Sequence, residues 1–268
     1  MIAALGPALL FCPADRPERF RGALEKADAV ILDLEDAVRP EAKAEARENI
    51  VAADLDPARV VVRVNASSTD DFAADLAALA RTGFRTVMVA KTDDAESLAA
   101  FDDDYSVIAL CETARGIRSA SRIAAHPRVV AMMWGAEDLV ASLGGTSSRF
   151  PDGGYRDIAR HARSHVLLEA AAQGKSAIDA VHIDIDDVEG LRREAEDAAA
   201  SGFAATACIH PRQVPVIRGA YAPDASTVEW ARSVLQASET ERGVFRFEGR
   251  MIDEPVLRHA RSVLARAE

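Results

Sequence analysis

The stretch AVILDLEDAV, residues 29–38, contains the pattern that decides the fold. Its first four residues, Ala29–Leu32, are all apolar, and acidic residues follow them almost at once. A short run that is apolar at every position suits a strand that is buried on both faces of a parallel sheet. The stretch therefore predicts such a strand, with charged side chains at the point where the strand ends.

Seven other runs repeat this pattern along the chain. The predicted strands are Ala8–Phe11, Ala29–Leu32, Val60–Val62, Thr86–Ala90, Val107–Cys111, Val129–Trp134, Ile178–Ile183 and Ala204–Ile209. Segments with helical spacing lie between them, namely Arg16–Lys26, Pro40–Ala53, Asp71–Arg81, Glu96–Phe101, Gly116–Ala125, Tyr155–Gln173 and Val188–Ser201. Eight strands that alternate with helices predict an α/β fold, a closed (β/α)₈ TIM barrel. An open, doubly wound sheet is the alternative, but no Gly-x-Gly-x-x-Gly fingerprint of dinucleotide binding follows the first strand.

The length of the chain bounds its domain organisation. Its 268 residues suffice for one barrel, which typically takes about 250 residues, plus a tail. We predict a catalytic barrel over residues 1–214 and a C-terminal helical extension over residues 215–268. Two helices are expected in the extension, at Ser226–Glu239 and Glu254–Arg266, and the extension could replace the last helix of the barrel.

Composition excludes several classes of partner. A formal net charge of −11 argues against nucleic acid, which needs a clustered basic face, and against an anionic membrane surface. No apolar run approaches the roughly 20 residues that cross a bilayer. The three cysteines are far apart in the sequence, and the N-terminus lacks the positive region and cleavage site of a secretion signal. We therefore expect a cytoplasmic protein.

Polar residues follow each of the eight predicted strands. In chain order they include Asp15, Arg16, Asp33, Glu35, Asp36, Arg63, Asn65, Lys91, Glu112, Arg115, Glu137, Asp138, Asp184 and His210. In a barrel the carboxyl ends of all strands meet at one face, which is where active sites are built. Any one of these residues could instead cap a helix or form an ion pair. Their recurrence at eight strand ends predicts a functional site.

The residue types in this ring indicate its chemistry. Glu112 and Asp138 follow adjacent predicted strands, and two carboxylates without clustered His or Cys suit Mg²⁺ rather than zinc. Arg63 provides a cation that could grip a carboxylate with two parallel hydrogen bonds. The three carboxylates of residues 33–36 repel one another, so we expect Arg63 or Lys91 to pair with them.

Three loops add candidate binding elements. Backbone N–H groups of Gly135, Ala136 and Glu137 could hold the oxygens of a small oxoacid. The loop of residues 144–148, Gly-Gly-Thr-Ser-Ser, is either a lid or an ordinary surface loop. The first loop contains Arg16, Arg19 and Arg21, a basic patch suited to a phosphate-bearing substrate, although salt bridges at the start of a helix explain the pattern equally well.

Seven strings of residues resemble one known family. They are LFCPADRPERF, ILDLEDAV, VVRVN, CETARG, MMWGAEDL, CIHPRQV and MIDEPVLRHA, in this order over nearly the whole chain. The chain resembles the stand-alone citrate lyase beta-subunit-like proteins of the HpcH/HpaI aldolase and citrate lyase superfamily, which includes malyl-CoA and citramalyl-CoA lyases. The resemblance implies a Mg²⁺-dependent enzyme, and a homotrimer, that cleaves or forms the C–C bond of a 3-hydroxyacyl-CoA. Retro-aldol or Claisen chemistry would give an oxoacid and an acyl-CoA.

The resemblance also implies roles for individual residues. These are Glu112 and Asp138 as metal ligands, Arg63 as the clamp for the substrate carboxylate, Glu35 as a carboxylate that organises the site, Arg16 with its neighbours Arg19 and Arg21 as contacts of the CoA phosphates, and Asp253 as the catalytic acid and base. The family delivers this last residue from a neighbouring subunit, whereas the residues alone predict only a helix N-cap at Asp253. Two positions depart from the family pattern: Lys91 follows Ala90 where proline is common, and Cys208 stands where a lysine-like residue is usual.

Three alternatives stay open at this level. The chain could be a lyase subunit that acts on a thioester of a carrier protein, a metal-dependent aldolase of free hydroxy-oxoacids, or a non-catalytic binder of CoA or an oxoacid. The basic patch favours free CoA, and the presence of Glu112, Asp138 and Asp253 argues against a non-catalytic role.

Overall fold

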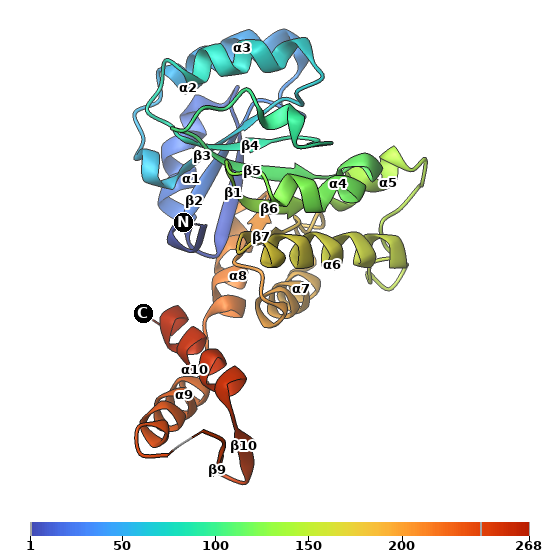
Figure 1. The fold of residues 1–268 in the computed structure, drawn as a ribbon. Coiled ribbons are helices and arrows are strands. Elements are labelled where there is room, and N and C mark those ends of the chain that lie inside the picture. The colour runs from blue at the N-terminus through green and yellow to red at the C-terminus, as the bar shows by residue number, and fades with distance from the viewer. Residues whose placement is uncertain (1, 242, 268) are drawn as a thin grey trace. The chain divides into compact units, whose positions relative to one another are not determined.

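Eight parallel strands form a closed barrel in the computed structural model, which describes residues 2–241 and 243–267 (Figure 1). The strands are β1 (Ala8–Pro13), β2 (Ala29–Asp33), β3 (Val60–Val64), β4 (Thr86–Val89), β5 (Ser106–Cys111), β6 (Val129–Trp134), β7 (Ser176–Asp179) and β8 (Ala205–Cys208). Each strand pairs with the next one along the chain, and β8 pairs with β1. The TIM-barrel prediction is confirmed, and the open sheet is excluded.

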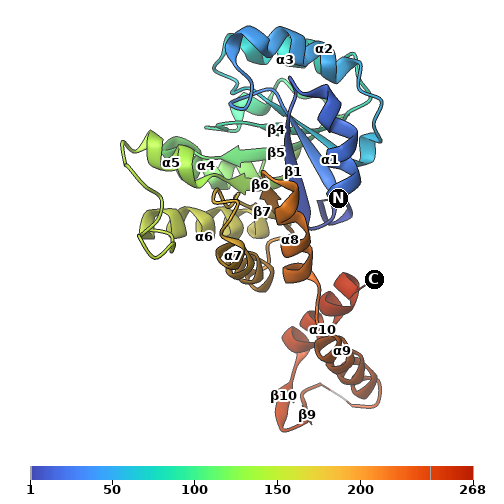
Figure 2. The ribbon, with the colours of Figure 1, turned by 180° about the vertical axis from the view of Figure 1, so that it is seen from behind.

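Helices lie outside the strands, as Figures 1 and 2 show. They are α1 (Phe20–Lys26), α2 (Lys43–Val51), α3 (Asp70–Leu79), α4 (Ala114–Ala124), α5 (Ala136–Ser142), α6 (Asp157–Ala172), α7 (Val188–Ser201) and α8 (Val214–Tyr221). Short 3₁₀ turns occur at Ile2–Leu5, Pro17–Arg19, Pro40–Ala42, Pro57–Arg59, Glu96–Leu98 and Pro211–Gln213. The sequence explains several boundaries: the Thr113 side chain caps α4 by accepting from Gly116 N–H, and Gly202 ends α7 in the left-handed conformation.

Alternating side chains of the strands fill the barrel interior. Successive residues of a strand point to opposite faces, so every second residue points inward. This interior core consists of Leu5, Leu9, Ala29, Ile31, Val61, Met88, Ile108, Leu110, Ala131, Met133, Ile178, Ala205 and Ala207. Two residues beyond Ile31, Val61 and Leu110 stand Asp33, Arg63 and Glu112, so the same alternation turns these charged side chains inward at the carboxyl ends of their strands.

Two predicted elements were wrong. The seventh strand runs over Ser176–Asp179 instead of Ile178–Ile183, so Asp179 stands at its end, and Asp184 lies in the following loop. The prediction extended too far because Ala180, which is buried, and Val181, which is half-buried, lie in a loop that lines a pocket. The helix expected at Glu96–Phe101 is only the 3₁₀ turn Glu96–Leu98.

The chain divides into two compact units, Met1–Ile217 and Arg218–Glu268. In the second unit α9 (Ala225–Ser238) packs against α10 (Glu254–Ala267), close to the two helices expected there. Between α9 and α10 the chain forms an antiparallel pair of short strands, β9 (Phe245–Phe247) and β10 (Arg250–Ile252). The sequence does not predict this pair. The unit has its own core, formed by Ala231, Val234, Ile252, Leu257, Ala260 and Val263.

The eighth strand is followed by a helix, since α8 begins six residues after β8 ends. This helix lies almost wholly within residues 215–268, so the first part of the predicted extension is the barrel's last helix, and α9 and α10 follow it along the chain. Within the described ranges, no helix is both long and apolar enough to cross a bilayer.

Candidate active site

A pocket of about 190 Å³ opens at the carboxyl ends of the barrel strands. Its lining consists of Phe11, Asp33, Ala37, Arg63, Leu110, Glu112, Met133, Gly135, Ala136, Glu137, Asp138, Ala180, Val181 and Ile209. Most of these residues continue the inward-facing rows of the core, which explains why strands β1, β2, β3, β5, β6, β7 and β8 all lead into one cavity. We call this cavity the mouth pocket.

Arg63 is held at the mouth by acidic neighbours. Its register partner on β2 is Asp33, and Nε and Nη2 donate to the two Asp33 carboxylate oxygens at 2.7 and 2.6 Å. Nη1 lies 3.1 Å from Glu35 Oε2, and the guanidinium carbon sits 4.8 Å from the centre of the Phe11 ring. A guanidinium carries five N–H donors, so these contacts leave two for a ligand. Burial disfavours the charged guanidinium and by itself lowers the pKa of Arg63. The nearby carboxylates outweigh this effect and raise the pKa above its usual value.

Lys91 neutralises the other crowded carboxylates. Its Nζ contacts Glu35 Oε1, donates to Asp36 Oδ2 at 2.8 Å and lies 3.4 Å from Asp138 Oδ1. Although burial favours the neutral acid, the Lys91 ammonium lowers the pKa of Asp36. The expectation that Arg63 or Lys91 would pair with residues 33–36 is confirmed for both cations.

Glu112 is buried at the end of β5, with 3% of its surface exposed. Oε1 accepts the backbone N–H of Lys91 at 3.1 Å. Burial first, and the negative charge of Asp138 second, raise the pKa of Glu112 to about 8. Such a carboxylate is costly to ionise unless a cation joins it.

Gly135 leaves room for the Glu112 side chain. The register pairs Cys111 with Trp134, so Glu112 and Gly135 are the next residues on adjacent strands. A Cβ on Gly135 would lie 2.6 Å from Glu112 Oε2 and 2.8 Å from Glu112 Cβ. The close packing requires glycine here and fixes the direction of the carboxylate.

Glu112 and Asp138 fit a magnesium ion. Both line the mouth pocket, and Lys91 contacts both, with its backbone N–H and its ammonium. No group of three or more His, Cys, Asp or Glu side chains suited to a metal occurs among the described residues. Two carboxylates with the remaining positions open to water and substrate oxygens are typical of Mg²⁺, which seldom binds in an all-protein cage.

The loop after α5 is anchored beside the mouth. Ser148 is buried, and its hydroxyl donates to Glu137 Oε1 at 2.6 Å, while residues 144–147 are exposed. Glu137, whose backbone N–H is predicted to face the substrate, therefore also holds this loop with its carboxylate. Gly135 and Ala136 line the pocket directly, as expected for residues whose backbone would face an oxoacid.

The predicted basic patch is only partly gathered at a cavity. A cleft of about 440 Å³ runs between β1, α1 and the end of β8, and Arg19, Lys26 and His210 line it. The side chains of Arg16 and Arg21 are more than half exposed and lie near Asp15 and Asp54, outside the lining. The cleft shares Phe11 and Ile209 with the mouth pocket, so the two cavities adjoin.

Asp253 belongs to the second compact unit and lies directly before α10. Its carboxylate accepts the backbone N–H of Val256 at 3.3 Å, and its carbonyl accepts that of Leu257. The N-cap interpretation is therefore confirmed. A capping carboxylate keeps acceptor capacity for a proton, so the cap leaves a chemical role open.

Comparison with known proteins identifies the family. The profile described as HpcH/HpaI aldolase/citrate lyase matches residues 8–211, and one described as a C–C bond lyase of the TIM-barrel fold matches residues 155–268. The chain belongs to the HpcH/HpaI aldolase/citrate lyase family. It is a carbon–carbon bond lyase, and the non-catalytic alternative is set aside.

Relatives within this family cover almost the whole chain. A citrate lyase subunit beta-like protein of Mycobacterium tuberculosis is 57% identical over 99% of this chain and 97% of its own length. A crystal structure of M. tuberculosis CitE in complex with magnesium, acetoacetate and coenzyme A covers 100% of this chain and 99% of the other, with a TM-score of 0.94 and 57% identity.

More distant relatives act on CoA thioesters, as their names state. A (3S)-malyl-CoA thioesterase of Cereibacter sphaeroides is 35% identical over 97% of this chain and 94% of its own length. The mitochondrial citramalyl-CoA lyase of Rattus norvegicus is 31% identical over 97% of this chain and 85% of its own length.

Sequence reasoning missed a buried polar network that supports the mouth of this lyase. Trp134 Nε1 donates to Asp179 Oδ1 at 2.6 Å, and Arg163 Nη2 donates to Asp179 Oδ2 at 2.8 Å. This network links the ends of β6 and β7 to α6. Asp179 lies within the predicted seventh strand, Ile178–Ile183, and the one signal for the network in the sequence is this acidic residue next to Ile178, which is expected to be buried.

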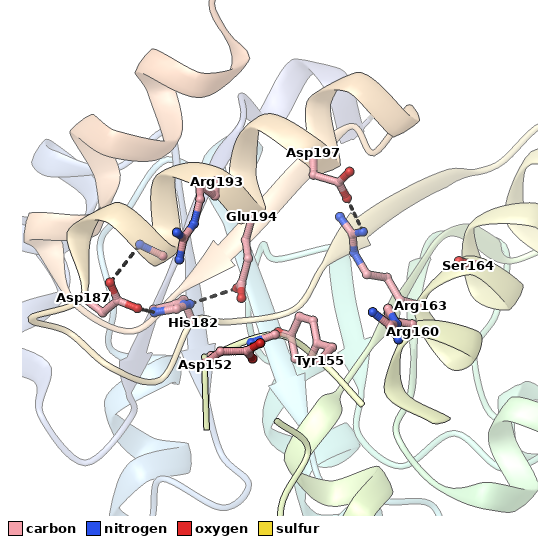
Figure 3. Close-up of a pocket in the computed structure, with 13 residues that line it drawn as sticks. Asp152, Tyr155, Arg160, Arg163, Ser164, His182, Asp187, Arg193, Glu194 and Asp197 are labelled. Atoms are coloured by element: carbon pink, nitrogen blue, oxygen red, sulfur yellow. Dashed lines mark hydrogen bonds and ion pairs between the residues drawn. The ribbon is translucent and has the colours of Figure 1, made fainter. Parts of the chain in front are cut away.

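The network borders a second pocket of about 430 Å³, shown in Figure 3. There His182 lies between Asp187 and Glu194, with Nδ1 2.9 Å from Glu194 Oε2, and Arg163 also pairs with Asp197. His182 and Arg163 thus both contact carboxylates of the chain itself. The second pocket adjoins the mouth pocket in sequence, since Ala180 and Val181 line one and His182 lines the other.

Proposed function

We propose that this enzyme is a Mg²⁺-dependent lyase of 3-hydroxyacyl-CoA thioesters such as malyl-CoA or citramalyl-CoA, cleaving or forming their C–C bond. The observation that carries the proposal is the mouth pocket, where a pair of carboxylates suited to Mg²⁺ and an arginine with two spare donors face one cavity. Complexes of the M. tuberculosis protein with magnesium, acetoacetate and coenzyme A support it.

Glu112 and Asp138 would hold the ion, which when bound acts as a Lewis acid on the oxygens of the oxoacid part. Arg63 would grip the oxoacid carboxylate with its two remaining N–H donors, since Asp33 and Glu35 fix its guanidinium. Glu35 thereby orients the clamp and does not need to touch substrate. The backbone of Gly135, Ala136 and Glu137 would surround the same oxygens.

The adjoining cleft suits the CoA part. Its lining contains Arg19 and Lys26, which offer positive charge to phosphates, and its shared border with the mouth at Phe11 and Ile209 lets a thioester reach the reacting carbon. Arg16 and Arg21 are exposed outside the lining and would add positive charge only at longer range. This continuity favours CoA over a free hydroxy-oxoacid, which would leave the cleft unused.

Cleavage requires one proton to leave and one to arrive. The 3-hydroxyl loses its proton, and the C2–C3 bond breaks so that C3 becomes the carbonyl carbon of the oxoacid. The electron pair of the broken bond stays with C2 as the enolate of the thioester, which then takes a proton at C2. We assign both transfers to Asp253 of a neighbouring subunit. The family resemblance suggests this assignment and a homotrimer.

A substrate panel tests the reaction. Purified enzyme is incubated with (R)- and (S)-malyl-CoA and citramalyl-CoA, with and without Mg²⁺, alongside the free hydroxy acids and a carrier-protein thioester. We expect an oxoacid and acetyl-CoA from one CoA ester, only when Mg²⁺ is present. Free CoA with intact hydroxy acid would identify a thioesterase, and turnover confined to a free acid or to the carrier would refute the proposal.

Mixing variants tests the shared site. Asp253→Ala chains retain an intact mouth, and Arg63→Ala chains retain an intact Asp253. If neighbours complete each other's sites, both variants are inactive alone, and co-refolding them restores a measurable fraction of activity. Glu254→Ala, which changes the adjacent carboxylate, is the matched control and should keep full activity. Failure of the mixture to regain activity would place Asp253 in its own chain's site or outside catalysis.

A further inference from the structure

Lys91 directly follows Ala90, the position near the mouth pocket that departs from the family pattern, and the backbone of Lys91 is unusual. It has φ +48°, in the left-handed region that side chains other than glycine, asparagine or aspartate seldom adopt. Among the described residues, Glu248 is the other non-glycine residue with positive φ. Such a conformation persists only where the surroundings enforce it.

Lys91 does not itself line the mouth pocket, but it contacts two carboxylates that do. Inward-facing positions on β4 alternate, so Met88 is followed by Ala90, and a regular extension would turn Lys91 outward. Instead its backbone N–H donates to Glu112 Oε1 at 3.1 Å, and its ammonium lies 3.4 Å from Asp138 Oδ1. One residue therefore contacts both carboxylates of the proposed metal site.

The ammonium has partners other than Asp138. It also contacts Glu35 and donates to Asp36 at 2.8 Å. Its side chain is 29% exposed, so it is neither fully solvated nor locked into the core. Losing the contact with Asp138 would thus leave the lysine paired.

We propose that Lys91 competes with the magnesium ion for Asp138 and so weakens metal binding to the unliganded mouth. Two cations that share one carboxylate repel each other, and in a partly buried site this repulsion exceeds thermal energy. Binding of Mg²⁺ releases Asp138 from the lysine, whose ammonium stays with Glu35 and Asp36. The backbone N–H of Lys91 keeps Glu112 in place throughout. This inference rests on the magnesium site of the proposed function.

Calorimetric titration with MgCl₂ alone, without substrate, tests it. We expect Lys91→Met to bind Mg²⁺ at least about tenfold more tightly than the natural enzyme. Lys91→Gly separates the charge from the backbone, because glycine accepts the left-handed conformation, and it should show the same tightening. Lys91→Arg keeps the cation and should stay within about threefold of the natural enzyme.

Lys175→Met is the matched control. It removes the same charge directly before β7, at the end of the strand opposite the mouth, and should change the affinity less than twofold. The rise in melting temperature on adding Mg²⁺ gives a second readout if Lys91→Met is poorly soluble. Unchanged or weaker Mg²⁺ binding in both Lys91→Met and Lys91→Gly would overturn the proposal. Lack of Mg²⁺ binding by the natural enzyme would instead refute the metal site, and this inference with it.

Discussion

Gly135→Ala tests how closely the scaffold sets the metal site. The added Cβ would lie 2.6 Å from Glu112 Oε2 and 2.8 Å from Glu112 Cβ, and protein Cβ atoms essentially never approach other atoms closer than 3.0 Å. The carboxylate oxygen must therefore move by at least about 0.4 Å, the shortfall of 2.6 Å from 3.0 Å. Because Glu112 Cβ is also too close, rotation of the carboxylate alone does not relieve the clash.

This displacement exceeds the tolerance of a magnesium site. Mg²⁺ requires oxygen ligands at about 2.0–2.1 Å in near-octahedral geometry, and a ligand about 0.2 Å out of place already disqualifies a site. We expect Gly135→Ala to weaken Mg²⁺ binding at least about tenfold, or about 1.4 kcal/mol. Overpacking should also lower the free energy of unfolding by about 1–3 kcal/mol.

Calorimetric Mg²⁺ titration and urea unfolding measure the two effects separately. Gly22→Ala is the matched control, because a Cβ at Gly22 in α1 meets no atom within 4 Å. It should leave Mg²⁺ affinity unchanged and should not destabilise the fold. Natural Mg²⁺ affinity in Gly135→Ala would refute the argument that Gly135 positions the Glu112 carboxylate.

Three further predictions concern the scaffold. Trp134→Phe removes the 2.6 Å hydrogen bond to the buried Asp179, so the free energy of unfolding in urea should fall by about 1–3 kcal/mol. A value near zero would mean that Arg163 and the Ala180 backbone N–H satisfy Asp179 without the tryptophan. Asp75→Ala removes a fully buried carboxylate that accepts from Arg47 and Asn65, and should cost about 3–5 kcal/mol by the same assay. Burial raises the pKa of the Cys12 thiol to about 11, so little of it is thiolate at pH 8. Alkylation of Cys12 in the folded enzyme, followed by mass spectrometry, should therefore be slow at pH 8 and should become faster as the pH rises. Rapid labelling at pH 8 would contradict the burial of this thiol.

The barrel was predictable because its strands are unusually uniform. Runs such as Ala29–Leu32 are buried on both faces, so no polar residue interrupts them, and a polar residue marks each end. The seventh strand shows the limit of this reasoning. Ile178–Ile183 is apolar at four of its six positions, but hydrophobicity does not distinguish a strand from a loop that lines a pocket. Asp179 is buried within it because Trp134, Arg163 and the Ala180 backbone N–H donate to its carboxylate.

The candidate site was predictable in its members but not in its contacts. Alternation along β2, β3 and β5 places Asp33, Arg63 and Glu112 inward once the strand ends are known. The left-handed backbone of Lys91 has no signal in the sequence, since lysine is an uncommon choice there, and the contact that it makes with Asp138 depends on that turn. The packing of Gly135 against Glu112 needs the register between β5 and β6, which residue patterns do not give.

The charges of the mouth imply an order of binding for the proposed reaction. Six carboxylates gather there with two cations: Asp33, Glu35, Asp36, Glu112, Glu137 and Asp138 against Arg63 and Lys91. An anionic oxoacid that enters alone meets net repulsion, because Arg63 is already paired with two of these carboxylates. A divalent cation reverses that balance locally and adds a direct attraction for the oxoacid oxygens. The metal ion should therefore bind before the oxoacid. The acidic excess of the chain argues against nucleic-acid partners, and at the mouth it would attract the ion on which substrate binding depends.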